Sequence, residues 1–349
     1  KYRKISAFIC PFTKFLNFFM QDLINPIFQS PENLESAFVD GLDNMLAQDE
    51  LGVFILVLAN ALFDDKLWKL LKPKLIKKFE HLKSQPITGA DDDVAVFNKL
   101  IKLDLNELEV TKWREIGGFE VQYNPLRALR PQRLSGAKTQ GMNAEFDENG
   151  FHFNKPFLQK EIFWSGQFFS KNVSLFYNKF PFANFHGLVV VESEKQHPQL
   201  LTYELHQFAW MMTNTVSLNI PGFSLAYNAY GAYASVNHFH LQCFVRDKAL
   251  PIENDEKYPL VNYTFQSVGD AWEFIEALHR DEQPYNLVYQ NNKILCVVRQ
   301  RQDDYTHADW TAGYAWYEAC GGVSTFDLDS FNNLKELDLK EELLKLKIT

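Results

Sequence analysis

The sequence His-Phe-His-Leu-Gln at 238–242 constrains the fold more than any other stretch of the chain. Successive side chains of a β-strand point to opposite faces, so a strand here places His238, His240 and Gln242 on one face. The apolar Phe and Leu between them fall on the other face, as does Cys243. The alternation therefore predicts a strand that packs through one face and presents nitrogen-bearing side chains on the other.

Two other interpretations of the histidine pair stay open on these residues alone. A histidine in a strand can simply be a hydrogen-bonded polar residue of the core, and imidazole is also the commonest metal ligand. A zinc site needs further ligands, and neither a third nor a fourth can be named for His238 and His240. We therefore expect no metal and no other cofactor.

The residues just before the histidines are small and polar. They include Asn228, Gly231, Ser235 and Asn237. Small residues let a backbone approach a ligand closely, and Ser and Asn supply short donors for phosphate oxygens. An ordinary turn into a strand fits the same residues, but next to the histidine strand they favour phosphoryl chemistry.

The whole run at 227–242, Tyr-Asn-x-x-Gly-Ala-x-Ala-Ser-x-Asn-His-x-His-x-Gln, resembles the active-site strand of the histidine-triad superfamily. It is most similar to the branch in which Gln replaces the third His. That branch contains galactose-1-phosphate uridylyltransferase, diadenosine tetraphosphate phosphorylase, and the GDP-L-galactose and GDP-D-glucose phosphorylases. The GDP-hexose phosphorylases are the nearest group, and the resemblance extends over 97–335.

Other segments match this family in the same order along the chain. A Gln-x-Asn-x-x-Arg segment ends at Arg127 and is followed by further basic residues. Asn178 and Lys179 resemble a nucleotide-binding strand end, and His186 resembles the histidine of the following turn. The segments at 151–155, 283–288 and 318–322 also fit.

The resemblance implies covalent catalysis. His240 attacks the α-phosphorus of a nucleoside diphosphate derivative and forms a nucleotidyl-histidine, which an acceptor then cleaves. His238 holds the local network, and a backbone carbonyl is expected to bind the ring proton of His240, which leaves the other nitrogen free. Gln242 can donate to a phosphate oxygen but cannot relay protons, so transfer or phosphorolysis is favoured over hydrolysis.

The same resemblance implies the substrate contacts. Arg127 suits phosphate because its planar guanidinium pairs with two oxygens. Arg130 and Arg133 are further candidates, for which a surface position is an equal alternative. The expected substrate- and phosphate-binding residues are Ser235, Asn237, Gly231, Asn228, Arg127, Asn178, Lys179 and His186.

Composition narrows the class of protein. The 349 residues are 46% hydrophobic and 23% charged, as in a globular protein with a sizeable core. The net charge of −9 offers no basic surface to nucleic acid, so an anionic substrate needs local donors. The cysteines lie far apart, without a Cys-x-x-Cys pair, which argues against disulfides and a zinc ribbon. We therefore expect a reducing, cytoplasmic location.

No membrane anchor is expected. The longest apolar run, 51–63, is shorter than the ~20 residues that span a bilayer. The N-terminal residues mix charged and apolar side chains without the pattern of a signal peptide.

Helical spacing dominates up to residue 85, and strand patterns dominate after residue 93. The intervening stretch contains Pro, Gly and an acidic run, which predicts a loop. The second N-terminal helix is expected to break near Pro73. Helices are predicted at 33–46, 51–82, 198–214 and 271–280, and strands at 119–123, 161–164, 173–177, 187–191, 223–227, 237–245, 285–289 and 294–299.

Strands flank a helix twice along the chain, which suits a duplicated core. We predict an α+β fold, with a duplicated histidine-triad-like antiparallel sheet, flanking helices and an N-terminal helical region. The predicted domains are a helical region at 1–90, a catalytic half at 91–250 and a degenerate half without the histidines at 251–349.

The sequence thus predicts a nucleotidyltransferase or phosphorylase that acts on a nucleoside diphosphate sugar of the GDP-hexose type. The acceptor is inorganic phosphate in the phosphorylases and a sugar phosphate in the transferases. Two alternatives stay open: a diadenosine polyphosphate phosphorylase, and an inactive nucleotide-binding or scaffold protein. We expect neither nucleic acid nor a membrane as a partner, and a homodimer is compatible with the sequence.

Overall fold

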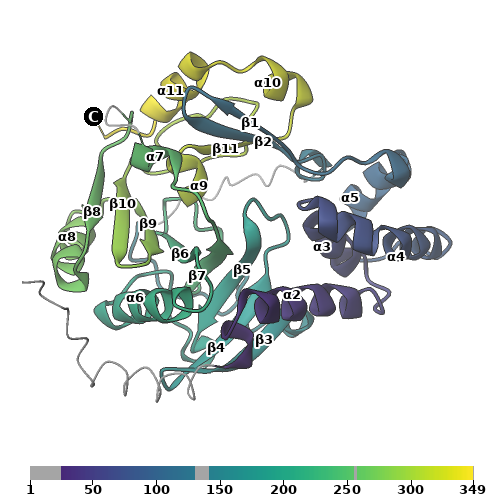
Figure 1. Ribbon diagram of the computed structural model, residues 1–349, viewed down its shortest axis with the longest axis horizontal. Coiled ribbons are helices and arrows are strands. Elements are labelled where there is room, and N and C mark those ends of the chain that lie inside the picture. Colours follow the sequence, from purple (N-terminus) through teal and green to yellow (C-terminus); the bar gives the residue numbers. More distant parts are fainter. Residues whose placement is uncertain (1–24, 130–140, 255–257, 349) are drawn as a thin grey trace, which may run out of the picture.

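The computed structural model describes residues 25–129, 141–254 and 258–348. A large antiparallel sheet lies at the centre, with the N-terminal helices beside one end and the C-terminal elements over one face (Figure 1). The predicted mixed α+β class with N-terminal helices is confirmed. Arg130 and Arg133 lie outside the described residues.

The N-terminal helices share a core, in which the helix at 51–61 is buried on nearly all sides and the other three bury one side each. In α2, Leu34, Phe38 and Leu42 recur at four-residue spacing and are buried. The helix begins after Ser30, whose side chain accepts a hydrogen bond from the backbone N–H of Asn33. The bounds are α2 (Pro31–Met45), α3 (Leu51–Ala61), α4 (Asp65–Lys83) and α5 (Asp91–Ile101).

The predicted break near Pro73 is wrong, because Pro73 lies inside α4. The helical stretch is interrupted before α4 instead, where the Asp64 carboxylate accepts a hydrogen bond from the backbone N–H of Leu67. Leu71 and Leu75 on either side of the proline are buried. Their packing outweighs the backbone hydrogen bond that proline lacks.

The stretch predicted as a boundary loop, 85–93, ends inside a helix that the sequence analysis missed. Three aspartates form the first turn of α5, where the helix dipole favours negative charge. Asp93 also forms an ion pair with Lys179. In the sequence alone, an acidic run of this kind indicates a solvated loop. Its place in a helix and its ion pair become apparent only in the fold.

The helices and strands predicted after residue 119 each correspond to an element of the structure. The strands are β1 (Lys112–Ile116), β2 (Phe119–Tyr123), β3 (Ile162–Phe168), β4 (Lys171–Tyr177), β5 (Asn184–Val191), β6 (Phe223–Asn228), β7 (His240–Val245), β8 (Asn262–Phe265), β9 (Tyr285–Gln290), β10 (Lys293–Val298) and β11 (Gly322–Thr325). The other helices are α6 (Tyr203–Ser217), α7 (Pro251–Asn254), α8 (Val268–Arg280), α9 (Trp316–Ala319), α10 (Leu328–Asn333) and α11 (Glu336–Leu344). Short 3-10 helices cover Pro26–Phe28, Leu105–Glu107, Arg127–Leu129, Pro156–Glu161 and Ser193–Lys195. The strands β1, β8 and β11 and the C-terminal helices were not predicted.

The eight-stranded sheet has the order β3-β4-β5-β7-β6-β9-β10-β8. Two stretches of chain have the same order of elements, β5-α6-β6-β7 and β8-α8-β9-β10. The antiparallel pairing of β6 with β9 joins them in the sheet. In both stretches the last strand lies between the other two. A smaller sheet, β1-β2-β11, pairs β2 in parallel with β11, so it crosses the domain boundary predicted at residue 250.

The two faces of the large sheet are covered differently. Leu241 and Cys243 of β7 belong to the core that contains α6 and α8. Phe244 of the opposite face packs with Trp316, Tyr317 and the C-terminal helices. The side chains of His240 and Gln242 share this second face, so the predicted division of β7 into two faces is confirmed. None of the helices among the described residues is long and apolar enough to cross a membrane.

Candidate active site

His240 is the first residue of β7 and is almost completely buried, with 4% of its surface exposed. Its Nδ1 atom lies 2.8 Å from the carbonyl oxygen of His238. A carbonyl oxygen only accepts, so Nδ1 carries the proton and Nε2 keeps its lone pair. Burial lowers the pKa of His240 to about 4, which keeps the ring neutral near pH 7. The Nε2 atom has no hydrogen-bond partner in the described parts of the chain.

Gln199 fixes the backbone of His240 and was not identified from the sequence. Its Oε1 accepts from the backbone N–H of His240 at 2.8 Å, and its Nε2 donates to the carbonyl oxygens of His240 and Asn228, each at 3.0 Å. The amide therefore takes the place of direct pairing between the ends of β6 and β7. The sequence analysis placed Gln199 inside the helix predicted at 198–214, whereas α6 begins at Tyr203, so the sequence offered no signal for this role.

Strand β7 begins later than predicted because the Gln199 side chain lies between the ends of β6 and β7. His238 lies in a bend before β7 instead of in the strand. Its Nδ1 accepts a hydrogen bond from the backbone N–H of Phe153, and the Phe153 ring contacts the rings of both His238 and His240. Burial, and then the neighbouring His240 and His152, lowers the pKa of His238 to about 4. The two predicted histidines therefore lie side by side, although only His240 is in the strand.

Gln242 is held through its oxygen. Oε1 accepts from the indole Nε1 of Trp316 at 2.7 Å and lies 2.9 Å from Nε2 of His186. The backbone N–H of Phe182 donates to Nδ1 of His186, so the proton of the neutral His186 ring is on Nε2 and points to Gln242. Burial lowers the pKa of His186 to about 3. With both donors on Oε1, the amide nitrogen of Gln242 is left to donate elsewhere.

The structure places Asn178 beside His186 and Lys179 farther out. The Asn178 side chain lies 3.2 Å from Nε2 of His186, and its backbone oxygen accepts from Asn60 of α3. The Lys179 ammonium forms an ion pair with Asp93 of α5. Both residues of this predicted strand end therefore contact the N-terminal helices.

The residues of the predicted phosphate-binding loop before the histidines differ in exposure and in whether their side chains are already hydrogen-bonded. Ser235 is exposed, and its hydroxyl has no partner among the described residues. The Asn237 side chain is used within the protein, since it bonds to the backbone of Ala144, Glu145 and Gln199. Gly231 has a φ of +93°, which favours glycine.

Asn228 is buried and joins the two parts of the large sheet. Its Oδ1 accepts from the side chain of Asn286 in β9 at 2.7 Å and from the backbone N–H of Trp316 at 2.9 Å. Asn228 therefore positions Trp316, which in turn holds Gln242.

Arg127 lies close to this network, with 13% of its side chain exposed. Its guanidinium lies 5.4 Å from the centre of the Phe182 ring and 3.9 Å from a carboxylate oxygen of Glu318. Phe182 also contacts the rings of His186 and Tyr317. Three buried atoms here lack a hydrogen-bond partner among the described residues: Nη1 of Arg127, Oε2 of Glu318 and Oε1 of Gln122.

Sequence analysis missed Trp316 and Glu318 as site residues, although it noted the segment at 318–322. They come from the second half of the chain and reach the histidine strand only through the packing of α9 on β7. No group of three or more His, Cys, Asp or Glu residues in the described chain is arranged to hold a metal ion.

Comparison with known proteins relates part of the chain to one family model. Residues 94–244 match the family model described as GDPGP1-like, N-terminal domain. The chain carries a GDPGP1-like domain. This domain contains all the predicted site residues from Arg127 to Gln242, whereas Trp316 and Glu318 lie outside it. The predicted resemblance is confirmed.

Two curated relatives match just under half of the chain. GDP-D-glucose phosphorylase 1 of Danio rerio is 31% identical over 156 residues, which cover 44% of this chain and 44% of that protein. The protein of the same name from Homo sapiens is 31% identical over 169 residues, or 46% of this chain and 43% of that protein. The matched stretch thus spans less than half the length of these relatives.

Solved structures of yeast Ap4A phosphorylase Apa2 align with 75% of the chain. The complex with Ap4A has a TM-score of 0.49 and 15% identity, over 75% of this chain and 100% of that chain. The Apa2 structure whose description names no ligand has the same score and 14% identity, over 75% of this chain and 97% of that chain.

Proposed function

We propose that this protein is a nucleotidyltransferase of the phosphorylase type, which forms a nucleotidyl-histidine on His240 and acts on a nucleoside diphosphate hexose. One observation carries the proposal. His240 is fixed through Nδ1 with Nε2 left without a partner among the described residues, and Gln242 on the same strand face has its oxygen occupied by two donors.

The proposed reaction has two displacements at the α-phosphorus. In the first, the lone pair of Nε2 forms a P–N bond while the bond to the bridging oxygen breaks, and the hexose 1-phosphate leaves. In the second, an oxygen of inorganic phosphate forms a P–O bond while the P–N bond breaks, which releases the nucleoside diphosphate. The proton stays on Nδ1 throughout, held by the His238 carbonyl.

Gln242 supports transfer to phosphate over hydrolysis. Its amide nitrogen can donate to a nonbridging oxygen of the phosphoryl group, because its oxygen is already bonded to Trp316 and His186. A neutral amide does not act as a general acid or base near pH 7. The group therefore stabilises charge without activating a water molecule.

The unpartnered atoms around Arg127 suit the hexose. Glu318 and Gln122 supply acceptors for sugar hydroxyls and Arg127 supplies a donor, beside the stacked rings of Phe182 and Tyr317. A buried polar atom without a hydrogen bond costs about 1–3 kcal/mol, so binding of a polyhydroxy ligand recovers free energy here. The names of the curated relatives, GDP-D-glucose phosphorylase 1, support a GDP-hexose as the substrate.

Intact-mass measurement tests the proposal. The protein is incubated with GDP-glucose, other nucleoside diphosphate hexoses and diadenosine tetraphosphate, each with and without inorganic phosphate. Without phosphate, we expect GDP-glucose to give a guanylyl adduct, and with phosphate we expect release of GDP. The His240→Ala variant should show neither. The His81→Ala variant, altered on the surface of α4, is the matched control and should keep both.

The alternatives give different results in the same experiment. If only diadenosine tetraphosphate gives an adduct, and that adduct is adenylyl, the protein is a diadenosine polyphosphate phosphorylase. If no substrate gives an adduct or turnover, and the His240→Ala variant binds nucleotide as tightly as the parent, the protein is an inactive nucleotide-binding protein. Release of GMP instead of GDP in the presence of phosphate contradicts the role proposed for Gln242.

A further inference from the structure

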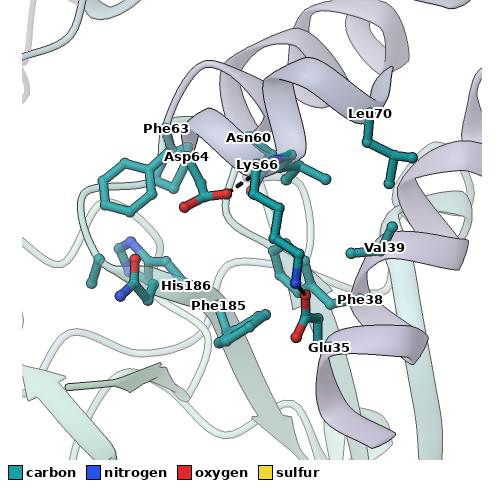
Figure 2. Close-up of a pocket in the computed structure, with 14 residues that line it drawn as sticks. Glu35, Phe38, Val39, Asn60, Phe63, Asp64, Lys66, Leu70, Phe185 and His186 are labelled. Carbon is teal, nitrogen blue, oxygen red and sulfur yellow. Dashed lines mark hydrogen bonds and ion pairs between the residues drawn. The ribbon is translucent and has the colours of Figure 1, made fainter. Parts of the chain in front are cut away.

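Two segments outside β7 border the candidate active site. His186 of β5 is bonded to Gln242 and lines a pocket of about 190 Å³. Figure 2 shows Phe63 and Asp64 of the α3–α4 turn facing His186 across this pocket. The other segment is the β6–β7 loop, residues 229–239, which contains several of the predicted phosphate-binding residues. This loop is held by the second half of the chain.

The backbone of the β6–β7 loop is bonded in both directions to the segment that follows β10. The N–H of Gln302 donates to the carbonyl oxygen of Gly231 at 2.8 Å. The side-chain Oε1 of Gln302 in turn accepts from the N–H of Tyr233 at 2.7 Å. The side chain of Asn286 in β9 adds a bond to the carbonyl oxygen of Ala232 at 3.0 Å. Three consecutive residues of the loop are therefore fixed by the second half of the chain.

Tyr233 has a backbone conformation that needs this support. Its φ of +69° lies in the left-handed region, which is unfavourable for a bulky residue. The buried Arg299 guanidinium lies 5.2 Å from the centre of the Tyr233 ring and also donates to the hydroxyl of Tyr305. Gly313 lies so close that a Cβ atom there would come within 2.0 Å of the Tyr233 ring. The strained backbone persists because packing fixes the ring and Gln302 binds the N–H.

The next donors of the loop are left without partners. The backbone N–H groups of residues 234–236 have no hydrogen-bond partner in the described parts of the chain, and the same holds for the Ser235 hydroxyl. Ala234 and Val236 are nevertheless buried, with 4% and 7% of their surface exposed. Successive backbone N–H groups of this kind bind anions. The loop therefore offers a row of donors a few residues before His240.

We propose that Gln302 is a positioning residue, which holds the β6–β7 loop so that the donors at 234–236 meet the phosphoryl group transferred to His240. The inference rests on the proposed function. Gln302 lies outside the GDPGP1-like domain at 94–244, as do the other residues that hold the loop from β9 onward. The second half of the chain, which lacks the histidines, thus completes the phosphoryl site of the first half.

Loss of the Gln302 acceptor has a defined consequence. The Tyr233 N–H is then left without its bond while the backbone still has an unfavourable φ, so the loop relaxes and its later N–H groups move. Displacement of positioning groups by about 1 Å can lower a reaction rate about a hundredfold. Gln302 acts through the loop and does not itself contact the phosphoryl group, so its loss should slow transfer more than it weakens substrate binding.

Hydrogen exchange of the loop amides, followed by mass spectrometry without substrate, tests the hold on the loop. Gln302→Met keeps the length of the side chain but removes the acceptor, whereas Gln302→Glu keeps an acceptor. Gln300→Met is the matched control, because the Gln300 side chain donates to the backbone of Lys347 instead of to the loop. We expect exchange at 229–239 to be about fivefold faster in Gln302→Met, as for loss of one hydrogen bond, and close to that of the parent in the other two variants.

Steady-state kinetics with GDP-glucose and phosphate separates a positioning role from a purely structural one. In Gln302→Met we expect kcat to fall about tenfold or more, with KM for GDP-glucose within about twofold of the parent. Gln302→Glu should regain most of the lost rate, and Gln300→Met should keep the kcat of the parent. A fall in kcat that Gln302→Glu does not restore, or an equal fall in Gln300→Met, overturns the proposal.

Failure of this inference differs from failure of the proposed function. If the parent forms neither the adduct nor GDP, the proposed function is wrong, and the exchange experiment still decides whether Gln302 holds the loop. If the parent is active and Gln302→Met has the same kcat, the positioning role alone is wrong. Equal exchange at 229–239 in the parent and in Gln302→Met also overturns the inference, whatever the activity.

Discussion

The Nδ1 atom of His240 lies 2.8 Å from the carbonyl oxygen of His238. This contact decides which ring nitrogen of His240 can attack, because the proton must stay where the carbonyl can accept it. The carbonyl belongs to the backbone of residue 238, so this contact does not depend on the histidine side chain there. The His238 ring makes a separate contact, because its Nδ1 accepts a hydrogen bond from the backbone N–H of Phe153.

The first prediction concerns the pH dependence of adduct formation. Burial lowers the pKa of His240 to about 4, so its Nε2 is unprotonated at any pH well above that value. We expect the rate of guanylyl adduct formation in quenched intact-mass experiments to be flat from pH 8 to about 5.5 and to fall below that. A loss of rate centred near the ordinary histidine pKa of ~6.5 contradicts this environment for His240.

The second prediction concerns stability in acid. Burial lowers the folded-state pKa of several histidines to between about 3 and about 4: His186, His206, His238, His240 and His279. Below pH 6.5 the unfolded chain binds protons that the folded chain does not, so the free energy of unfolding falls with pH until the folded pKa is reached. We expect urea titrations to show a loss of more than about 2 kcal/mol between pH 7 and pH 5, because one such histidine alone can contribute that much. The His206→Gln variant, which removes one of these groups, should lose less, and equal stability at both pH values is the contrary result.

The third prediction concerns the support of Gln242. Trp316→Phe removes the indole N–H that binds Oε1 of Gln242 and keeps an aromatic ring against Phe244. A neutral hydrogen bond contributes ~1 kcal/mol, so we expect kcat for phosphorolysis to fall about fivefold. Trp113→Phe, at a tryptophan that is 47% exposed, is the control and should be unaffected. An unchanged kcat in Trp316→Phe shows that Gln242 is positioned by other contacts.

The fourth prediction concerns Gln199. Gln199→Ala leaves the backbone N–H of His240 and two carbonyl oxygens without partners in the core, so we expect the free energy of unfolding to fall by about 2–3 kcal/mol in urea. Gln199→Glu keeps the acceptor for the His240 N–H but places a buried carboxylate against two carbonyl oxygens, so adduct formation at pH 7 should fall at least as far as in Gln199→Ala. Full stability and full activity of Gln199→Ala would show that strands β6 and β7 pair directly without it.

Local sequence patterns predicted most of the central sheet. Strands such as β2, β9 and β10 agree with the alternation or the apolar runs in the sequence, since each is short and bounded by turn residues. The start of β7 differs because Gln199, far away in sequence, occupies the backbone groups of His240. Likewise Pro73 does not break α4, because burial on both sides of it outweighs the local cost.

The sequence by itself determined the chemistry that this protein presents: two histidines and a glutamine at alternating positions, after a loop of small and polar residues. Alternation along a strand is a local property of the backbone, so it can be read without the fold. Only the tertiary structure decided which atoms of these residues are free. Trp316 and His186 occupy the oxygen of Gln242, and Gln199 holds His240, through contacts between segments that are far apart in the chain. Such contacts depend on how helices and sheets pack, and no local pattern encodes them.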